Sequence, residues 1–270
     1  MPKLALTNDW VKRSPSRLNM ERIEAFFSGH GFTPHRHDTY AIGYTLSGVQ
    51  SFRYRRAQRH SLPGNTLVLH PDEVHDGQAG TDAGFRYRMA YIEPALIQQV
   101  LGGKPLPFIA GGLSSDPRLH HAARALLCNL ESVLEPLEQD DLIYDLAHAL
   151  DQAAGQGLTR KALDFVAAER ARAFIHSALD RVITLDELSQ ACSRDRWRLS
   201  RDFRALYGTS PYRYITQRRL DLARAMLLAG HSLTEAALSA GFFDQSHMSR
   251  HFMQSYGVSP GRWLRRLGQS

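Results

Sequence analysis

The sequence predicts an α+β chain of several domains, in which a small antiparallel β domain comes first and an all-helical domain comes last. Between residues 23 and 92, short runs of strand-forming residues alternate with turn signals. From residue 117 onward, apolar residues recur at spacings of three and four, which is the period of a helix. Within the last hundred or so residues one helical pattern occurs twice.

The composition is that of an ordinary soluble protein and excludes several classes. Of 270 residues, 43% are hydrophobic and 22% are charged, so the chain is neither disordered nor collagen-like. No apolar run approaches the roughly 18 to 20 residues that span a bilayer, and the start lacks the apolar stretch of a secretory signal. We therefore expect a cytoplasmic protein with no membrane partner. Cys128 and Cys192 are far apart and predict neither a disulfide framework nor a thiolate metal site.

The net charge of +6 is unevenly divided. Residues 1–157 hold 15 basic against 17 acidic side chains, whereas residues 158–270 hold 18 against 10. Lys161 is the only lysine of the second part, so its other positive charges are arginines, whose planar fork suits phosphates and guanine edges. This favours a nucleic-acid partner. On charge alone, a solvated basic face on an unrelated helical domain is equally acceptable.

The β part begins with two strands that predict a hairpin. Residues 40–46 and 49–55 are rich in strand formers and are separated by Ser47-Gly48, a turn signal. Residues 66–70 and 85–92 supply further strands. In the second strand apolar and charged side chains alternate, as a sheet with one solvated face requires, in the order Phe52, Arg53, Tyr54, Arg55. We expect a small sandwich or barrel.

Residues 117–154 predict a helical hairpin that breaks near Pro136. The pair serves either as a lid on the β domain or as a surface for a second copy of the chain, and the second use makes a homodimer the expected assembly. Gly155-Gln156-Gly157 then marks a flexible break. The predicted domains are 1–115 for the β domain, 116–157 for the helical dimerisation or linker segment, and 158–270 for the helical domain.

An internal repeat organises the helical domain. LSRDFRALYGTSPYRYI, residues 199–215, aligns with MSRHFMQSYGVSPGRWL, residues 248–264, at a constant offset of 49. Eight of the seventeen positions are identical, which chance does not produce. The repetition predicts two copies of one structural unit.

Each copy carries the signals of two short helices joined by a tight turn. Thr184 with Glu187, and Ser232 with Glu235, form capping boxes that start the first helices. The expected N-caps of the second helices, and the glycines that end them, are Ser193, Asp244, Gly208 and Gly257. Such a unit is a helix-turn-helix, whose second helix enters the major groove of DNA. A connecting helix over about 211–229 joins the two units.

Helical geometry predicts the residues that face DNA. Trp197 and Arg201 lie four apart on one face, where an indole can contact a thymine methyl and an arginine can contact guanine or phosphate. Glutamine suits adenine. The candidate DNA-binding residues are Arg194, Trp197, Arg198, Ser200 and Arg201 in the first unit and Gln245, Ser246, Ser249 and Arg250 in the second.

Two alternatives concern the same helices. Arg201 and Arg250 could instead form ion pairs with acids such as Asp202 or Asp221, although their equivalent positions in the repeat argue against this. His247 and His251, in the second helix of the second unit, are expected to pack against neighbours or to face solvent rather than to contact bases.

At this point the chain resembles the AraC/XylS family of bacterial transcription regulators. The resemblance covers about residues 183–265 and is carried by the repeat and by AALSAGFFDQSHMSRHFMQSYGVSPGRW. It implies a DNA-binding domain with two helix-turn-helix units, in which the candidate residues above take the base-facing positions. Phe243 departs from the pattern, because many members have a polar residue there.

The first part resembles the cupin-like sensor domain that many members carry. The matching segments are His35-Arg-His37, Ser47-Gly48, Pro63-Gly64 and Pro71 to His75. In metal-binding cupins a glutamate completes a site of three histidines, but here Ala41 and Ile42 stand at the glutamate positions. The missing carboxylate favours an organic effector over a metal, although the three histidines could still make a site of the kind that zinc or iron accepts. The implied effector-binding residues are His35, His37, Tyr40, Ile42, Tyr44 and His75. Tyr40, Ile42 and Tyr44 share strand parity and are expected to point into the barrel.

Together these observations predict a cytoplasmic regulator that binds specific double-stranded DNA and is controlled by a small-molecule effector. We expect no catalytic residues, no cofactor and no resident metal, and RNA polymerase is a candidate partner. Two other readings stay open. One is a metal-dependent cupin enzyme with a DNA-binding tail, and the other is a ligand-independent DNA binder whose barrel only dimerises.

Overall fold

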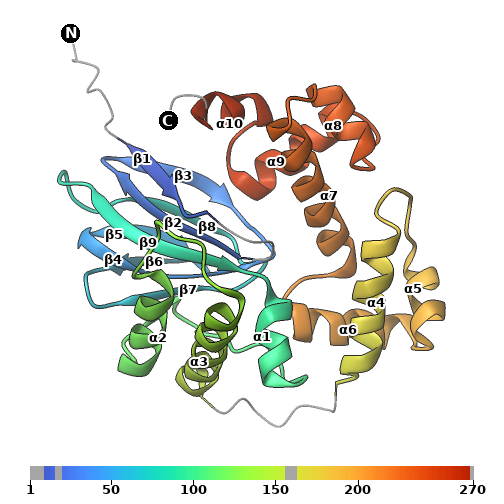
Figure 1. Ribbon diagram of the computed structural model, residues 1–270, viewed down its shortest axis with the longest axis horizontal. Helices are drawn as coiled ribbons and strands as arrows, with labels where there is room; N and C mark the ends of the chain where they lie inside the picture. Colours follow the sequence, from blue (N-terminus) through green and yellow to red (C-terminus); the bar gives the residue numbers. More distant parts are fainter. Residues whose placement is uncertain (1–8, 16–19, 156–162, 268–270) are drawn as a thin grey trace. The chain divides into compact units, whose positions relative to one another are not determined.

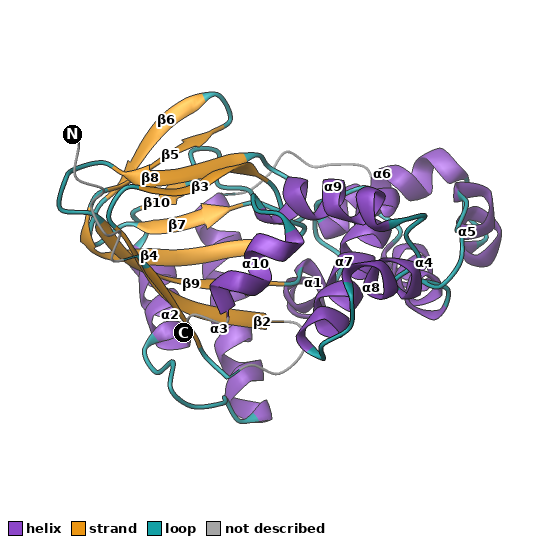
Figure 2. Ribbon diagram, turned by 90° about the horizontal axis from the view of Figure 1, so that it is seen from above, coloured by secondary structure: helices purple, strands orange, loops and turns teal. Residues whose placement is uncertain are grey.

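The computed structural model of the chain describes residues 9–15, 20–155 and 163–267 (Figures 1 and 2). By its internal contacts the chain divides into two compact units, built mainly from residues before 160 and from residues 161–270. Residues 156 and 157 of the predicted break lie outside the described residues. Among the helices that the structure describes, none is long and apolar enough to cross a membrane.

In its described residues the first unit contains two β-sheets and three helices, which confirms the predicted β-rich domain. In the described part, one sheet has the strand order β1-β2-β9-β4-β7-β10 and the other has the order β3-β8-β5-β6. The strands are β1 (Trp10–Arg13), β2 (Met20–Phe27), β3 (His30–His35), β4 (Tyr40–Gly48), β5 (Gln50–Tyr54), β6 (Ala57–Ser61), β7 (Thr66–Leu69), β8 (His75–Ala79), β9 (Phe85–Ile92) and β10 (Leu113–Ser114).

The predicted hairpin between β4 and β5 is wrong. Strand β4 pairs antiparallel with β7 and β9, whereas β5 pairs with β6 and β8, so the chain passes from one sheet to the other at Gly48. Gly48 has a left-handed φ of +73°, and a Cβ there would lie 2.0 Å from the carbonyl oxygen of Gly84. A glycine is therefore required at this crossing. The predicted alternation in β5 is confirmed, because Phe52 and Tyr54 are buried and Arg53 is exposed.

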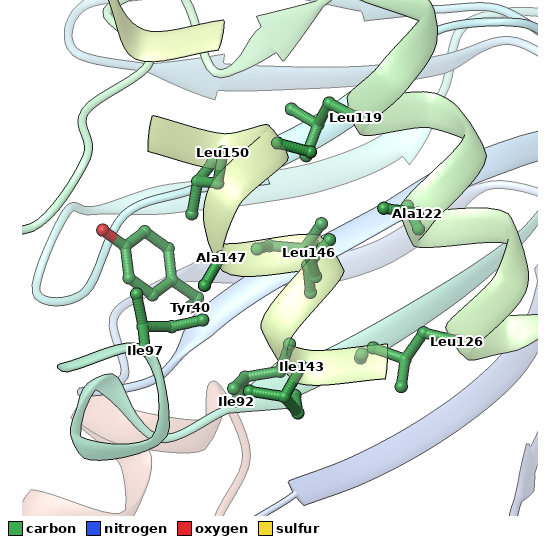
Figure 3. Packing of buried hydrophobic residues seen from close by; sticks show 14 of the residues in the cluster. Tyr40, Ile92, Ile97, Leu119, Ala122, Leu126, Ile143, Leu146, Ala147 and Leu150 are labelled. Atoms are coloured by element: carbon green, nitrogen blue, oxygen red, sulfur yellow. The ribbon is translucent and has the colours of Figure 1, made fainter. Parts of the chain in front are cut away.

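Three helices pack on the outer face of the larger sheet, and the apolar side chains between these helices and the sheet form the main core of this unit. They are α1 (Pro94–Leu101), α2 (Pro117–Leu127) and α3 (Pro136–Ala154), and the last two are the predicted helical hairpin. Asp116 caps α2 by accepting the Arg118 N–H at 2.8 Å. Leu119, Leu146 and Leu150 are fully buried against the sheet (Figure 3). A separate core, with Phe52 and Tyr87, unites residues of the two sheets.

The second unit is all-helical. Its helices are α4 (Phe165–Ser177), α5 (Leu185–Cys192), α6 (Arg196–Tyr207), α7 (Pro211–Leu228), α8 (Leu233–Ser239), α9 (Gln245–Tyr256) and α10 (Pro260–Leu267). Helices α5 and α6 form the first helix-turn-helix, α8 and α9 form the second, and α7 connects them. Buried residues of α7, α8 and α9, including Leu220, Ala236 and Phe252, form one core.

Most of the predicted helix boundaries are confirmed. Both capping boxes are present, Asp244 caps α9, and Gly208 and Gly257 follow α6 and α9 with φ of +73° and +67°. The predicted cap of α6 is wrong. Ser193 adopts a left-handed conformation that closes α5, and Asp195 instead accepts the first N–H groups of α6 at 3.2 and 3.0 Å.

Candidate nucleic-acid interface and sensor site

Helix α6 exposes the side chains that were predicted to read DNA and buries those predicted for the core. Trp197 is 67% exposed, and Arg198 and Arg201 also face solvent. Leu199 and Phe203 are completely buried. This division follows from helical periodicity, since the exposed residues recur on one face of α6.

A buried carboxylate engages two of the candidate arginines. Asp202 is 1% exposed and accepts Arg194 Nη2 at 2.9 Å and Arg201 Nε and Nη2 at 2.9 and 2.7 Å. Burial by itself would raise the pKa of Asp202, but the bonds from Arg201 and Arg194 outweigh it and lower this pKa. The alternative of an Arg201–Asp202 ion pair is thus observed. Because the Arg201 side chain is still 48% exposed, it can also meet a phosphate.

Two of the candidate DNA-binding residues of the first helix-turn-helix are instead engaged by other residues of the protein. Ser200 does not face solvent: it is buried and accepts a hydrogen bond from Arg204. Arg194 holds Asp202 and also lies 3.4 Å from the carboxylate of Asp164. Ser200 lies one turn before the completely buried Phe203, and this places it toward the buried side of α6.

Helix α9 carries a comparable exposed face. Gln245, Ser246 and Arg250 are exposed, and Ser249 is partly exposed. Thr234 Oγ1 donates to Gln245 Oε1 at 3.0 Å, which leaves the amide NH₂ of Gln245 to act as a donor. Within the part of the chain that the structure describes, no ion pair engages Arg250. Its fork differs in this respect from that of Arg201.

One exposed aromatic residue beside α9 was not among the candidates. Phe243 is 87% exposed and stands immediately before Asp244, the N-cap of α9. An apolar ring at the start of a recognition helix suits a thymine methyl or a sugar. Its departure from the family pattern was the sequence signal that could have identified it.

The three candidate sensor histidines come together. His35 ends β3 and His75 begins β8, the strand beside it in the smaller sheet, and His37 follows β3. Their ligand atoms all lie within 4.8 Å of one another. His75 Nδ1 lies 3.0 Å from the carbonyl oxygen of Glu73, so this nitrogen is the donor and Nε2 is the second polar atom of the ring. Three imidazoles at this spacing suit an anionic group, and their number also suits zinc or iron.

The other three sensor candidates do not point into the barrel, which corrects the prediction. Tyr40, Ile42 and Tyr44 do share one face of β4, but helices α1, α2 and α3 cover that face. Figure 3 shows Tyr40 beside Ile97 of α1. The Tyr40 hydroxyl donates to the Pro107 carbonyl at 2.7 Å, and burial raises its pKa well above the usual value. These residues are core residues.

A further histidine of the first unit, His70, was missed by the sequence reasoning. Its ring lies edge-on to Tyr40 and Phe108, with centroids 5.3 and 5.0 Å away. Burial lowers the pKa of His70 to about 4, because the charged imidazolium is poorly solvated there. His70 is therefore neutral at physiological pH. A lone histidine at the end of a strand gave no sequence signal for this.

Comparison with known proteins agrees with this organisation. Residues 17–147 match the family of AraC-like ligand binding domains, and residues 188–266 match a helix-turn-helix domain family. The XylDLEGF operon transcriptional activator 1 of Pseudomonas putida is 33% identical over 276 residues, covering 92% of this chain and 79% of that protein. YbfI of Bacillus subtilis, an uncharacterized HTH-type transcriptional regulator, is 23% identical over 235 residues, covering 84% and 86%.

A solved structure has the same fold. ToxT from Vibrio cholerae O395 aligns with a TM-score of 0.62 at 13% identity, covering 98% of this chain and 99% of that one. The matched ligand-binding and helix-turn-helix domains, the repeated unit and the relative from Pseudomonas putida lead to one assignment: the chain belongs to the AraC/XylS family of transcription regulators.

Proposed function

We propose that this regulator binds operator DNA sequence-specifically through α6 and α9, and that a small anionic effector bound by the AraC-like ligand-binding domain, residues 17–147, controls this binding. The observation that carries the proposal is the repeated helix-turn-helix, in which both second helices expose polar side chains on one face, with Trp197 exposed on α6 and Phe243 exposed just before α9. The DNA-facing residues that we propose are Trp197, Arg198, Arg201, Phe243, Gln245, Ser246, Ser249 and Arg250. Arg194 acts on this surface indirectly, through Asp202.

The effector site that we propose lies at His35, His37 and His75. Imidazole N–H groups donate to carboxylate oxygens, and three rings whose nitrogens lie within 4.8 Å can bind one such group. ToxT has been solved with an unsaturated fatty acid bound, so carboxylic acids are the first class to test here. Tyr40, Ile42 and Tyr44 support the site only through the core behind β4.

We further propose that the chain works as a cytoplasmic homodimer, that it contacts RNA polymerase, and that it is not an enzyme. The relatives are named as transcription regulators, which supports the last point. For dimerisation, α2 and α3 form a groove of about 480 Å³ that opens to solvent, with Leu142 and Ala149 on its α3 side. A helix of a second copy would cover Leu142, which is only partly buried, whereas Ala149 is already buried.

The test is to sequence the DNA that the full-length protein retains in cells, with Arg250→Ala as the matched variant. We expect a small set of sites that share one motif, and loss of that set in the variant. A collection of fragments with no shared motif would refute sequence-specific binding. The carboxylic acids to be tested are substrates or products of the enzymes encoded beside those sites. Each acid is titrated against operator-bound wild-type protein and against the His37→Ala and His75→Ala variants. An effector whose action survives His37→Ala and His75→Ala would refute the proposed pocket, and a stoichiometric metal lost in both variants would support the metal alternative.

A further inference from the structure

Two histidines of α9 face each other one turn apart. His247 and His251 are four residues apart, and their Nε2 atoms lie 3.0 Å from one another. Both rings pack on the buried ring of Phe242, with centroid distances of 5.5 and 6.1 Å, which restricts their rotation. Both side chains are partly exposed, so the pair is open to solutes.

The hydrogen bonds around the pair assign its protons. The Phe243 N–H donates to His247 Nδ1 at 3.4 Å, so the neutral His247 ring carries its own proton on Nε2. That N–H then donates to His251 Nε2, which accepts with its one lone pair.

From this geometry we propose that His247 and His251 form a binding site for a divalent transition metal of the zinc type, with water in the remaining coordination positions. Histidines at i and i+4 on one helix face are a recurrent zinc-binding pair. Zinc–nitrogen bonds are about 2.0–2.1 Å, so two nitrogens on one tetrahedral zinc lie roughly 3.3 Å apart. The observed 3.0 Å needs only a small ring rotation. Zinc replaces the proton between the two Nε2 atoms, and that proton moves to Nδ1 of His247, so the metal-bound ring stays a neutral imidazole.

The comparison of the two repeats shows that the fold does not require this pair. At the offset of 49, His247 stands where the first helix-turn-helix has Arg198, and His251 stands where it has the buried Asp202. Phe243 replaces Arg194, the other partner of Asp202. The second helix-turn-helix therefore has two imidazoles and a phenyl ring at the positions where the first has Arg198 and the Arg194–Asp202 ion pair. Metal binding also ends the Phe243–His247 hydrogen bond, because Nδ1 of a metal-bound ring carries the proton.

The test measures the reactivity of each histidine in the full-length protein. Diethyl pyrocarbonate modifies free imidazoles, and peptide mass spectrometry reads the rate at each position with and without zinc sulfate. We expect zinc in excess of the three-histidine cluster to slow the modification of His247 and His251 together, by about tenfold once free zinc is about ten times its Kd, while the exposed His231 is unaffected. Unchanged rates at His247 and His251 under excess zinc would overturn the proposal.

The variants remove one imidazole at a time without adding a carboxylate, which would itself bind zinc. In His251→Gln, zinc should no longer protect His247. In His247→Arg, the residue that the first helix-turn-helix carries at this position, zinc should no longer protect His251. Calorimetry should show the double variant binding one zinc fewer per chain than the wild type. Protection of His247 that persists in His251→Gln refutes a shared metal. If one single variant fails to fold, as circular dichroism would reveal, the other provides the same test from the opposite side of the pair.

Discussion

Arg201 and Arg250 occupy equivalent positions in the two helix-turn-helix units, yet we expect them to contribute differently to DNA recognition. Arg201 uses Nε and Nη2 on the buried Asp202, at 2.9 and 2.7 Å, so its fork is already occupied. No ion pair engages Arg250 in the described part of the chain, and its fork can meet a guanine in two hydrogen bonds. Arg250 is therefore the predicted base reader, and Arg201 is a predicted phosphate contact.

The magnitudes follow from these roles. Arg250→Ala should weaken operator binding by about 1–3 kcal/mol, or roughly 5- to 150-fold, with little loss on random DNA. Arg201→Ala should weaken binding to the operator and to random DNA by the same factor, and it should reduce the slope of log affinity against log salt concentration by about 1. The Arg201 variant keeps the Arg194–Asp202 pair, at 2.9 Å, so the fold should be retained.

Fluorescence anisotropy on a selected operator duplex and on a random duplex, over a series of salt concentrations, provides the measurement. Arg59→Ala, an exposed substitution in the first unit, is the matched control and should change nothing. If Arg201→Ala discriminates against the operator while Arg250→Ala affects both DNAs equally, the reasoning from the Asp202 ion pair is refuted.

Three further predictions concern stability, each measured by denaturation of the full-length chain. The pKa of His70 is lowered from 6.5 to about 4 in the folded chain, so below pH 6.5 the unfolded chain binds a proton that the folded chain does not. The free energy of unfolding should therefore fall as the pH drops from 6.5 toward 4. His70→Gln should flatten that pH dependence, and an unchanged slope would show that His70 is not the group responsible. Gly48→Ala should cost more than about 1 kcal/mol, and more than the control Gly64→Ala, where φ is also positive but nothing lies within 4 Å of a Cβ. Asp195→Ala should cost about 1 kcal/mol by removing the cap of α6, whereas Ser193→Gly should cost nothing because the residue is left-handed; equal losses would restore Ser193 as a cap.

The helical half of the chain could be predicted from local signals. Capping boxes, C-terminal glycines and proline at the first helical turn act within a few residues of one another, so they mark helix boundaries without knowledge of the fold. The internal repeat gave the second unit an independent check on the first. Ser193 was misjudged because two residues close together, Ser193 and Asp195, both have capping side chains, and only the backbone conformation distinguishes them.

The β half depended on contacts between residues distant in sequence. A turn signal at Ser47-Gly48 shows that the chain bends, but not which strands become neighbours. Strand parity likewise placed Tyr40, Ile42 and Tyr44 on one face, and this was correct. Parity is a property of one strand, however, and cannot say which layer covers each of its two faces.

By itself, then, the sequence determined the class of the protein, its order of β and helical domains, its repeated helix-turn-helix and the periodic faces of α6 and α9. Only the tertiary structure decided that Asp202 holds the fork of Arg201, that Ser200 is buried and bonded to Arg204, and that helices bury the Tyr40 face of β4. The physical reason is range. Capping and helical periodicity act over a few residues of chain, whereas ion-pair choice, sheet pairing and burial depend on which distant side chains share the same space.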